Sequence, residues 1–318
     1  GATADSATEF LRSKSRGDEA VRCSAIEWVI LRPGLVLAPN AYGGSALLRM
    51  AAGVPLVEGA LLPDAQIQTV SIDDVCECIC EAVDGRVESG SDIEVLETQI
   101  HTLAEVTRAF RQWLGFAPPY LRISVPRQLA YAAAWLADGL SLLGWRSPLR
   151  TTALNSLEAG VTGDAAKATA ILGRNPRSMT QTLAAMPSTL QDRWFARLYL
   201  LLPVIVATLA AFWIASGFVG LVRVAEAASV ISPAWASPRV AGVAVVGLSA
   251  LDITLGLAVL FRSSARKACG AMIVVSLLYL IGATIVAPAL WLDPMGPLVK
   301  VVPAMVLALV TMAVLEER

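Results

Sequence analysis

Charged residues are scarce in this sequence, and histidine is almost absent. Asp, Glu, Lys and Arg make up 16% of the 318 residues, against about a quarter in a typical soluble domain. The formal net charge is −1, so no basic field indicates nucleic-acid binding. The single histidine, His101, lies far from the cysteines in sequence and is expected to be an exposed loop residue. The sequence therefore predicts no nucleic-acid partner and no metal site.

Cysteine is sparse as well. Of five cysteines, Cys76, Cys78 and Cys80 share one short segment whose pattern predicts a helix. On a helix Cys76 and Cys80 lie on one face, and Cys78 points away from it. Because no further ligand is near, we interpret the three as small packing residues in a reducing compartment.

Hydrophobic residues are plentiful instead, at 56% of the chain with a mean hydropathy of +0.62. They are concentrated after residue 190, in stretches close to the roughly 20 residues that span a bilayer. Four such stretches follow one another, at about 198–222, 240–261, 268–292 and 297–315. We predict an all-α bundle of four transmembrane helices in residues 191–318, preceded by a soluble domain in residues 1–190.

Basic residues near these stretches predict the orientation in the membrane. Six flank one side of the predicted bundle and three flank the other, and the more basic side is normally cytoplasmic. We therefore expect a multi-pass protein of the cell inner membrane, with both termini and the soluble domain in the cytoplasm. Trp213, Trp235 and Trp291 are expected near the interfaces, where indole rings are favoured.

Asp252 is unusual because it interrupts the second apolar stretch at a depth of roughly 18 Å by helix rise. A charge at this depth is costly, and such residues are functional candidates. Thr208, Ser276 and Tyr279 are predicted at similar depth, so we expect Asp252 to face the bundle interior near at least one of them. Two roles remain open: a protonated acid that hydrogen-bonds within the bundle, or a proton or substrate site.

The first 190 residues alternate predicted helices and strands, which indicates an α/β domain of the doubly wound kind. A helix is predicted at 7–22, and a buried strand at 27–32 ends at Pro33 and Gly34. Further strands are predicted at 68–72 and 93–96. Helices are predicted at 74–84, capped by Ser71 or Asp73, and after the capping box at Thr102. The apolar segment 129–145 is too short to span; it lies on the bilayer surface, covers a cleft, or is buried in the domain.

Several motifs in this order resemble the second half of an atypical or extended short-chain dehydrogenase/reductase, in the branch that contains an accessory subunit of respiratory complex I. They are Thr8-Glu-Phe-Leu-Arg-Ser-Lys14, Leu31-Arg-Pro-Gly34, Val70-Ser-Ile-Asp-Asp74, Asp164-Ala-Ala-Lys167 and Ile171-Leu-Gly-Arg-Asn-Pro176. The apolar segment, with Trp213-Ile-Ala-Ser-Gly217, resembles DoxX-like four-helix proteins. The resemblance implies a truncated Rossmann-type domain joined to a membrane bundle.

Family membership implies binding of NAD or NADP at a Gly-rich first turn. No such turn stands before Phe10, and the chain begins without Met or a signal-peptide leader. We interpret it as a fragment or a processed chain that binds the cofactor weakly, whereas a longer parent would bind it well. By the same resemblance Lys14 matches the catalytic lysine, and Pro33 and Gly34 lie against the nicotinamide. Without the resemblance, Lys14 is a solvated lysine and the Pro-Gly pair a strand terminator.

Phe10 stands where the family has its catalytic tyrosine, and phenylalanine has no exchangeable proton. We expect its ring to pack in the core. Neither Tyr42 nor Tyr120, the tyrosines nearest to the expected cleft, has the spacing of the motif. Two functions follow: an NAD(P)H oxidoreductase that passes reducing equivalents to a quinone, lipid or other small-molecule acceptor in the membrane, or a non-catalytic nucleotide-binding sensor or assembly module.

Overall fold

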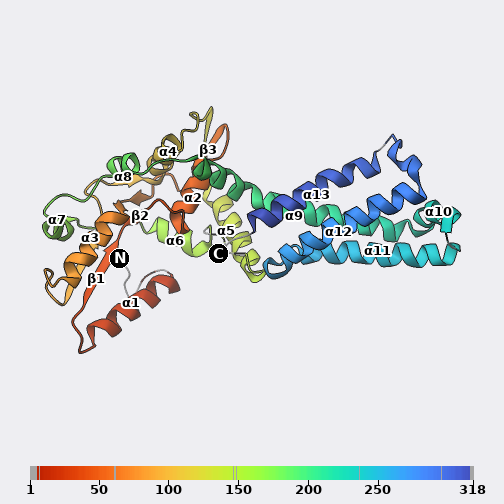
Figure 1. Ribbon diagram of the computed structural model, residues 1–318. Helices are drawn as coiled ribbons and strands as arrows, with labels where there is room; N and C mark the ends of the chain where they lie inside the picture. The colour runs from red at the N-terminus through yellow and green to blue at the C-terminus, as the bar shows by residue number, and fades with distance from the viewer. Residues whose placement is uncertain are drawn as a thin grey trace. The chain divides into compact units, whose positions relative to one another are not determined.

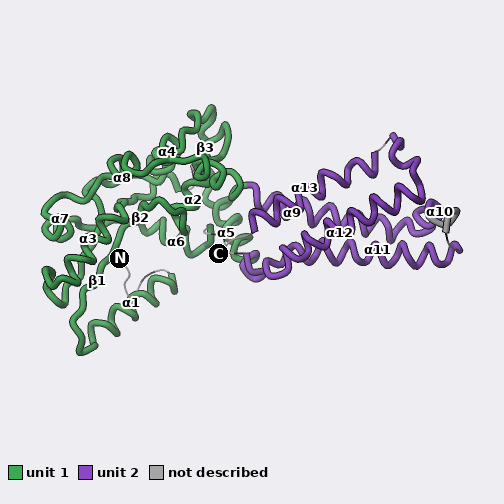
Figure 2. Tube along the Cα trace, in the orientation of Figure 1, with its two compact units in different colours: residues 1–139, 146–200 green, residues 140–145, 201–318 purple. Residues whose placement is uncertain are grey.

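The computed structural model describes residues 6, 8–60, 62–145, 147, 149–235, 237–294 and 296–315, without the side chains of 60 and 231–235. The chain forms two compact units (Figure 2). One comprises residues 1–139 and 146–200, and the other residues 140–145 and 201–318. Each is described below by itself.

The first unit mixes short strands with helices (Figure 1), which confirms the predicted α/β class. Its strands are β1 Val29–Pro33, β2 Leu35–Leu37, β3 Val57–Ala60, β4 Gln66–Ile67, β5 Thr69–Ser71, β6 Ser91–Val95, β7 His101–Thr102 and β8 Leu121–Ser124. Its helices are α1 Glu9–Arg22, α2 Gly43–Ala52, α3 Ile72–Val83, α4 Leu103–Trp113, α5 Arg127–Leu142, α6 Thr151–Glu158, α7 Ala166–Leu172 and α8 Met179–Ala185.

The strands pair mainly in parallel, as expected where helices connect them. β1 pairs with β6 from Val29↔Ser91 to Pro33↔Val95, β2 with β5, and β3 with β8. Only β4 and β7, among the described strands, pair antiparallel. Val70, Ile93 and Val95 form a core with Cys78 of α3.

The α3 helix confirms the packing role for Cys78 only, and it confirms that Cys76 and Cys80 lie on a different face from Cys78. Ser71 caps it by accepting a hydrogen bond from the Asp73 backbone N–H at 3.3 Å. Cys78 is fully buried, and burial raises the pKa of its thiol to about 11. Cys76 and Cys80 are exposed. Cys78 therefore behaves as a small apolar residue at neutral pH.

Two expectations about the first unit are wrong. Phe10 is 57% exposed, because none of the residues of α1 is buried. His101 is only 7% exposed, because it belongs to β7 and pairs with Ile67 of β4. Its Nε2 atom lies 3.2 Å from Oε1 of Glu97, a side chain that is 1% exposed. The capping box at Thr102 and Glu105, in contrast, is confirmed.

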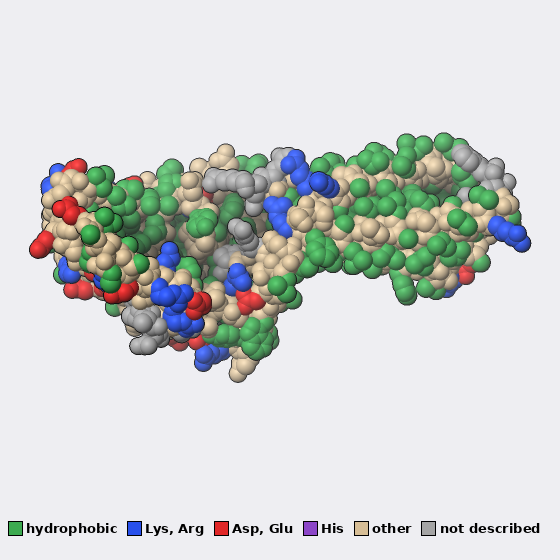
Figure 3. Space-filling model, turned by 90° about the horizontal axis from the view of Figure 1, so that it is seen from below, with side chains coloured by type: hydrophobic (Ala, Val, Ile, Leu, Met, Phe, Trp, Pro, Cys, Tyr) green, Lys and Arg blue, Asp and Glu red, His purple; other side chains and the backbone are tan. Residues whose placement is uncertain are grey.

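The second unit is helical, as predicted. Its elements are α9 Leu190–Val222, of which the residues up to Leu200 belong to the first unit, α10 Val224–Trp235, α11 Pro238–Ala258, α12 Arg262–Val286, the 3₁₀ turn η1 Pro288–Trp291, and α13 Pro297–Val314. In the described part of the chain, α9, α11, α12 and α13 are long and apolar enough to cross a membrane. Figure 3 shows hydrophobic side chains over most of the visible bundle surface.

Three details of the bundle differ from the sequence prediction. The third helix ends at Val286 because Pro288 disfavours helical geometry in the residue before it, and Ala287 has φ −142°. The helix α10 was not predicted. Trp213 is 3% exposed and packs in the bundle core rather than at an interface. The Trp235 side chain lies outside the described residues, and Trp291 is 41% exposed.

Candidate functional site

Asp252 of α11 is 5% exposed, and hydroxyl groups of two other helices bond to its carboxylate. Tyr279 of α12 donates its hydroxyl hydrogen to Oδ1 at 2.7 Å. Ser216 of α9 donates to Oδ2 at 3.1 Å. The prediction that Asp252 faces the interior near at least one of Thr208, Ser276 and Tyr279 is thus confirmed, with Tyr279 as the neighbour that bonds to it. We call these three residues the intramembrane triad.

The other two predicted neighbours of Asp252 behave differently. Thr208 is exposed, and its hydroxyl donates to the Val204 carbonyl of its own helix at 2.8 Å. Ser276 is 3% exposed, but no hydrogen bond between it and Asp252 is present among the described residues. Sequence reasoning missed Ser216, although it lies in the quoted motif that ends at Gly217. Ser216 is the one hydroxyl residue in that motif, so a search of the motif for a hydrogen-bond partner of Asp252 would have found it.

Glycines allow α9 and α11 to approach closely enough for this contact. A Cβ atom on Gly217 would overlap the Ser249 carbonyl and lie 3.1 Å from Cβ of Asp252. On α11, a Cβ on Gly256 would lie 2.7 Å from Cγ1 of Ile214. Small residues at such crossings let backbones pack closely in membranes. The sequence therefore fixes the position of Ser216 against Asp252 through the glycine beside it.

The site residues predicted for the first unit are distributed over two elements, α1 and the end of β1. Lys14 and Phe10 lie one turn apart on α1, with the Lys14 Nζ atom 5.8 Å from the centre of the Phe10 ring. Gly34 follows β1, where a Cβ would lie 2.5 Å from the Gln68 carbonyl oxygen, so no larger residue fits. Among the described residues, no hydrogen bond joins Lys14 or Phe10 to Pro33 or Gly34. Tyr42 and Tyr120 are 89% and 88% exposed.

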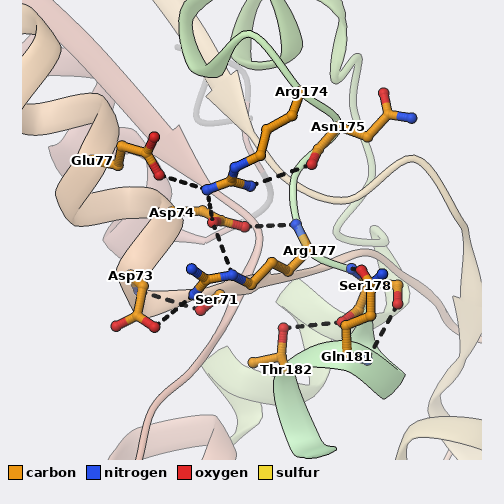
Figure 4. Close-up of polar contacts among 10 residues, drawn as sticks. All are labelled: Ser71, Asp73, Asp74, Glu77, Arg174, Asn175, Arg177, Ser178, Gln181 and Thr182. Atoms are coloured by element: carbon orange, nitrogen blue, oxygen red, sulfur yellow. Dashed lines mark hydrogen bonds and ion pairs between the residues drawn. The ribbon is translucent and has the colours of Figure 1, made fainter. Parts of the chain in front are cut away.

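A charged network instead surrounds Asp74, which is fully buried on α3 (Figure 4). Arg174 donates to its Oδ1 at 2.8 Å, and the Arg177 backbone N–H donates to its Oδ2 at 2.6 Å. The hydrogen bond to Asp74 is the main cause of the raised pKa of Arg174. Arg177 also pairs with the exposed Asp73 at 2.6 Å. Asp74 thus fastens the loop between α7 and α8 onto α3.

Glu97 is a second buried acid that sequence reasoning missed. Its Oε1 accepts hydrogen bonds from the backbone N–H and the hydroxyl of Thr69, at 3.1 and 2.5 Å. Its Oε2 accepts from the Met179 backbone N–H at 2.9 Å. These hydrogen bonds tie β5 to the start of α8.

Among the described residues, no group of three or more His, Cys, Asp or Glu is placed to hold a metal ion.

Comparison with known families identifies the membrane part. The DoxX-like family model matches residues 210–309. The chain carries a DoxX-like domain. Together with the four apolar helices, this match confirms the resemblance predicted for the membrane segment. The intramembrane triad lies entirely within the DoxX-like domain.

Comparison with solved structures finds sugar-nucleotide epimerases. UDP-glucuronic acid 4-epimerase from Bacillus cereus, solved with UDP-glucuronic acid and NAD, is 16% identical, with a TM-score of 0.36 over 63% of this chain and 58% of that one. UDP-glucose 4-epimerase from Thermotoga maritima is 13% identical, with a TM-score of 0.35 over 55% and 50%. The chain thus spans between half and three fifths of the length of these structures. The sequence matches no curated protein.

Proposed function

We propose that this chain belongs to a membrane-anchored, NAD(P)H-linked oxidoreductase that passes reducing equivalents to an acceptor in the bilayer, such as a quinone or a lipid. The observation that carries the proposal is the intramembrane triad. A carboxylate in the middle of a membrane costs about 3 kcal/mol on insertion scales, so it is retained where function needs it. Reduction of a quinone by a hydride also takes up a proton, and in this proposal Asp252 supplies that proton within the DoxX-like domain.

The resemblance to short-chain dehydrogenases supports the cofactor. The exposed Lys14 ammonium offers three hydrogen-bond donors, which suit ribose hydroxyls. Gly34 has no side chain at the turn where the resemblance places the nicotinamide, and the structure leaves no room for one. The given residues offer no Gly-rich turn for the pyrophosphate, so we expect this chain alone to bind NAD or NADP weakly. When bound, the cofactor supplies the hydride; Lys14 would orient its ribose.

The test is Asp252→Asn in native membranes, with NAD(P)H oxidation measured against an added quinone analogue. General acid–base groups contribute about 10²- to 10⁴-fold, so we expect at least about a 100-fold loss of rate. The matched control is Thr254→Val on the same helix, since Thr254 is exposed and bonds only to the Ala250 carbonyl in its own helix. Full activity in Asp252→Asn would overturn the role of Asp252.

A non-catalytic nucleotide-binding sensor or assembly module is the second candidate, and Phe10 favours it. Its exposed ring stands where the resembling family places the proton donor. We expect Phe10→Tyr to change turnover of a generic carbonyl substrate little, because a hydroxyl alone does not restore substrate positioning. If native membranes bind NADH by fluorescence titration but transfer no electrons to any quinone, the second candidate replaces the first.

We further propose that both termini and the first unit are cytoplasmic and that the membrane is a bacterial-type inner membrane. The basic residues Arg262, Arg266 and Lys267 at the start of α12 support this orientation. Cysteine probes placed at 225–237 or 293–296 should react with an impermeant reagent in sealed cells. Reaction of probes at 262–267 under the same conditions would reverse the orientation.

A further inference from the structure

The helix α5 presents its large apolar residues outward. Its buried side chains are all small: Ala130, Ala134 and Ala137 are 1%, 0% and 7% exposed. On the other side, Leu129, Trp135, Leu136 and Leu142 are 62%, 68%, 67% and 88% exposed. A surface helix of a soluble protein normally shows the reverse pattern, with large apolar residues turned toward the core.

The outward residues form one continuous face. At 100° per residue, Leu129, Ala132, Ala133, Leu136 and Gly139 share a side of the helix, and Trp135 and Leu142 border it. All seven are exposed. Gln128 is the one polar residue among the exposed positions from 128 to 142 that the structure describes. We call this surface the outer face of α5.

The end of α5 is attached to the membrane bundle. Residues 140–145 belong to the same compact unit as the transmembrane helices. The Arg262 backbone N–H donates to the Leu143 carbonyl at 2.9 Å, and the Trp145 indole N–H donates to the Leu260 carbonyl at 2.6 Å. Leu260 lies in the turn after α11, which ends at Ala258, and Arg262 is the first residue of α12. The last residues of α5, from Leu140 on, therefore belong to the compact unit that contains the membrane spans.

The residues at this turn suit lipid headgroups. Arg262 lies with its guanidinium 5.8 Å from the Trp145 ring, and Arg266 and Lys267 are exposed in the next turn of α12. Cationic side chains attract anionic headgroups, and Trp is enriched at the boundary between headgroups and acyl chains. An amphipathic helix at this boundary lies in the membrane plane with its apolar face buried about 5–10 Å deep.

We propose that α5 is an interfacial helix whose outer face rests in the bilayer surface. Lipid is the occupant because the spans that hold Leu143 and Trp145 already require a bilayer at that level. The outer face also has almost no polar group that would specify a protein partner. This inference rests on the membrane insertion of the bundle and not on any nucleotide or redox activity.

The test is photo-crosslinking of the full chain in vesicles of phosphatidylethanolamine and phosphatidylglycerol. The crosslinker p-benzoylphenylalanine replaces Trp135 or Leu136, which are large and exposed, so the fold should tolerate it. Val274 on α12, 56% exposed, is the positive control for lipid contact. The exposed Thr152 on α6 is the control for water contact.

We expect phospholipid adducts, identified by intact mass, at positions 135 and 136 in a yield comparable to that at 274, and none at 152. A crosslink to a second copy of the chain, or to another part of the same chain, would overturn the proposal. So would the absence of adducts at 135 and 136 while position 274 reacts.

Discussion

Among the described residues, each of the two compact units buries one aspartate, and the partners of the two carboxylates differ. In the first unit, Asp74 is fully buried and accepts hydrogen bonds from the Arg174 guanidinium and the Arg177 backbone. In the bundle, Asp252 accepts from two neutral hydroxyls, and no ion pair to it is present among the described residues. A cation offsets the desolvation of a buried carboxylate by Coulomb attraction, whereas a hydroxyl offers only a hydrogen bond.

In the proposed function, this difference separates a structural acid, Asp74, from one that exchanges a proton, Asp252. The hydrogen bond to Asp74 raises the pKa of Arg174, so the guanidinium stays charged and holds a carboxylate opposite it. A hydroxyl both donates and accepts, so Tyr279 and Ser216 can serve either protonation state of Asp252. We infer that Asp74 holds elements of the fold together, while Asp252 can gain or lose a proton without losing its partners.

The largest expected effect is that of Asp74→Ala. Removing one partner of a buried ion pair costs about 3–5 kcal/mol, so we expect the first unit to lose that much free energy of unfolding. The neighbouring variant Asp73→Ala is the matched control. Its carboxylate also pairs with Arg177, but its side chain is 68% exposed, and exposed pairs contribute under about 1 kcal/mol. Proteolysis of the full chain in nanodiscs at increasing urea would measure both; equal losses would contradict the distinction.

The elements that sequence predicted best are those set by local rules. The capping box at Thr102, the serine cap at Ser71 and the length of the apolar stretches depend on neighbouring residues, and the structure has all of them. The end of α12 was placed too late because the apolar stretch continues through Pro288, although proline stops the helix before it. The helix-stopping effect of proline is a local rule that applies here, but the hydropathy of the stretch alone predicts a later end.

Contacts between distant residues could not be predicted in the same way. His101 is buried because β7 pairs with β4, which no property of its own segment reveals. Depth along the helices correctly placed Tyr279 beside Asp252, but depth does not fix rotation, so Thr208 was included and Ser216 was not. The packing of α9 on α11 through Gly217 decides which hydroxyl faces the carboxylate.

The second prediction disrupts the hydrogen bond between Ser216 and Asp252 without changing either residue. Gly217→Val would push α9 away from α11, because even a Cβ atom at this position overlaps Ser249. Overpacking costs typically about 1–3 kcal/mol, so we expect a lower thermal midpoint in detergent. In a background in which the other four cysteines are replaced by serine or alanine, reaction of a fluorogenic maleimide with the buried Cys269 reports the unfolding of the bundle.

The control for this variant is Gly247→Val on α11, where a Cβ would meet no atom within 4 Å. We expect its midpoint to remain near that of the wild type. If the two valine variants lowered the midpoint equally, close packing at Gly217 would not position Ser216.

The third prediction concerns Asp92, a half-buried acid of the first unit. Hydrogen bonds from Arg32, chiefly, and from Arg22 lower the pKa of Asp92 below its usual value. A lowered pKa means that the stabilisation is complete above about pH 4, the unfolded value, and is lost as pH falls through the folded value. Because the group is partly solvated, we expect Asp92→Asn to cost only about 1 kcal/mol at pH 7.

This cost should shrink as pH falls below about 4, because the wild type then loses the same contribution on the way to the lowered folded pKa of Asp92. The exposed Glu88→Gln variant corrects for general effects of charge removal. Urea unfolding of the first unit in the full chain, followed by proteolysis at pH 7 and near pH 3, compares the variants. A difference that grew on acidification would contradict the lowered pKa of Asp92.

The smallest expected effect on stability is that of Asp252→Asn. An asparagine amide can accept a hydrogen bond from one hydroxyl and donate to the other, so Tyr279 and Ser216 both keep a partner. Hydrogen bonds between helices in membranes contribute about 0.6 kcal/mol on average, and here they are exchanged rather than lost. We expect a thermal midpoint close to that of the wild type in the Cys269 assay, whereas Asp252→Leu, which leaves both hydroxyls unpaired, should lower it. A stability loss from Asp252→Asn as large as that from Asp74→Ala would show that the fold depends on a charged Asp252, and the contrast between the two acids would fail.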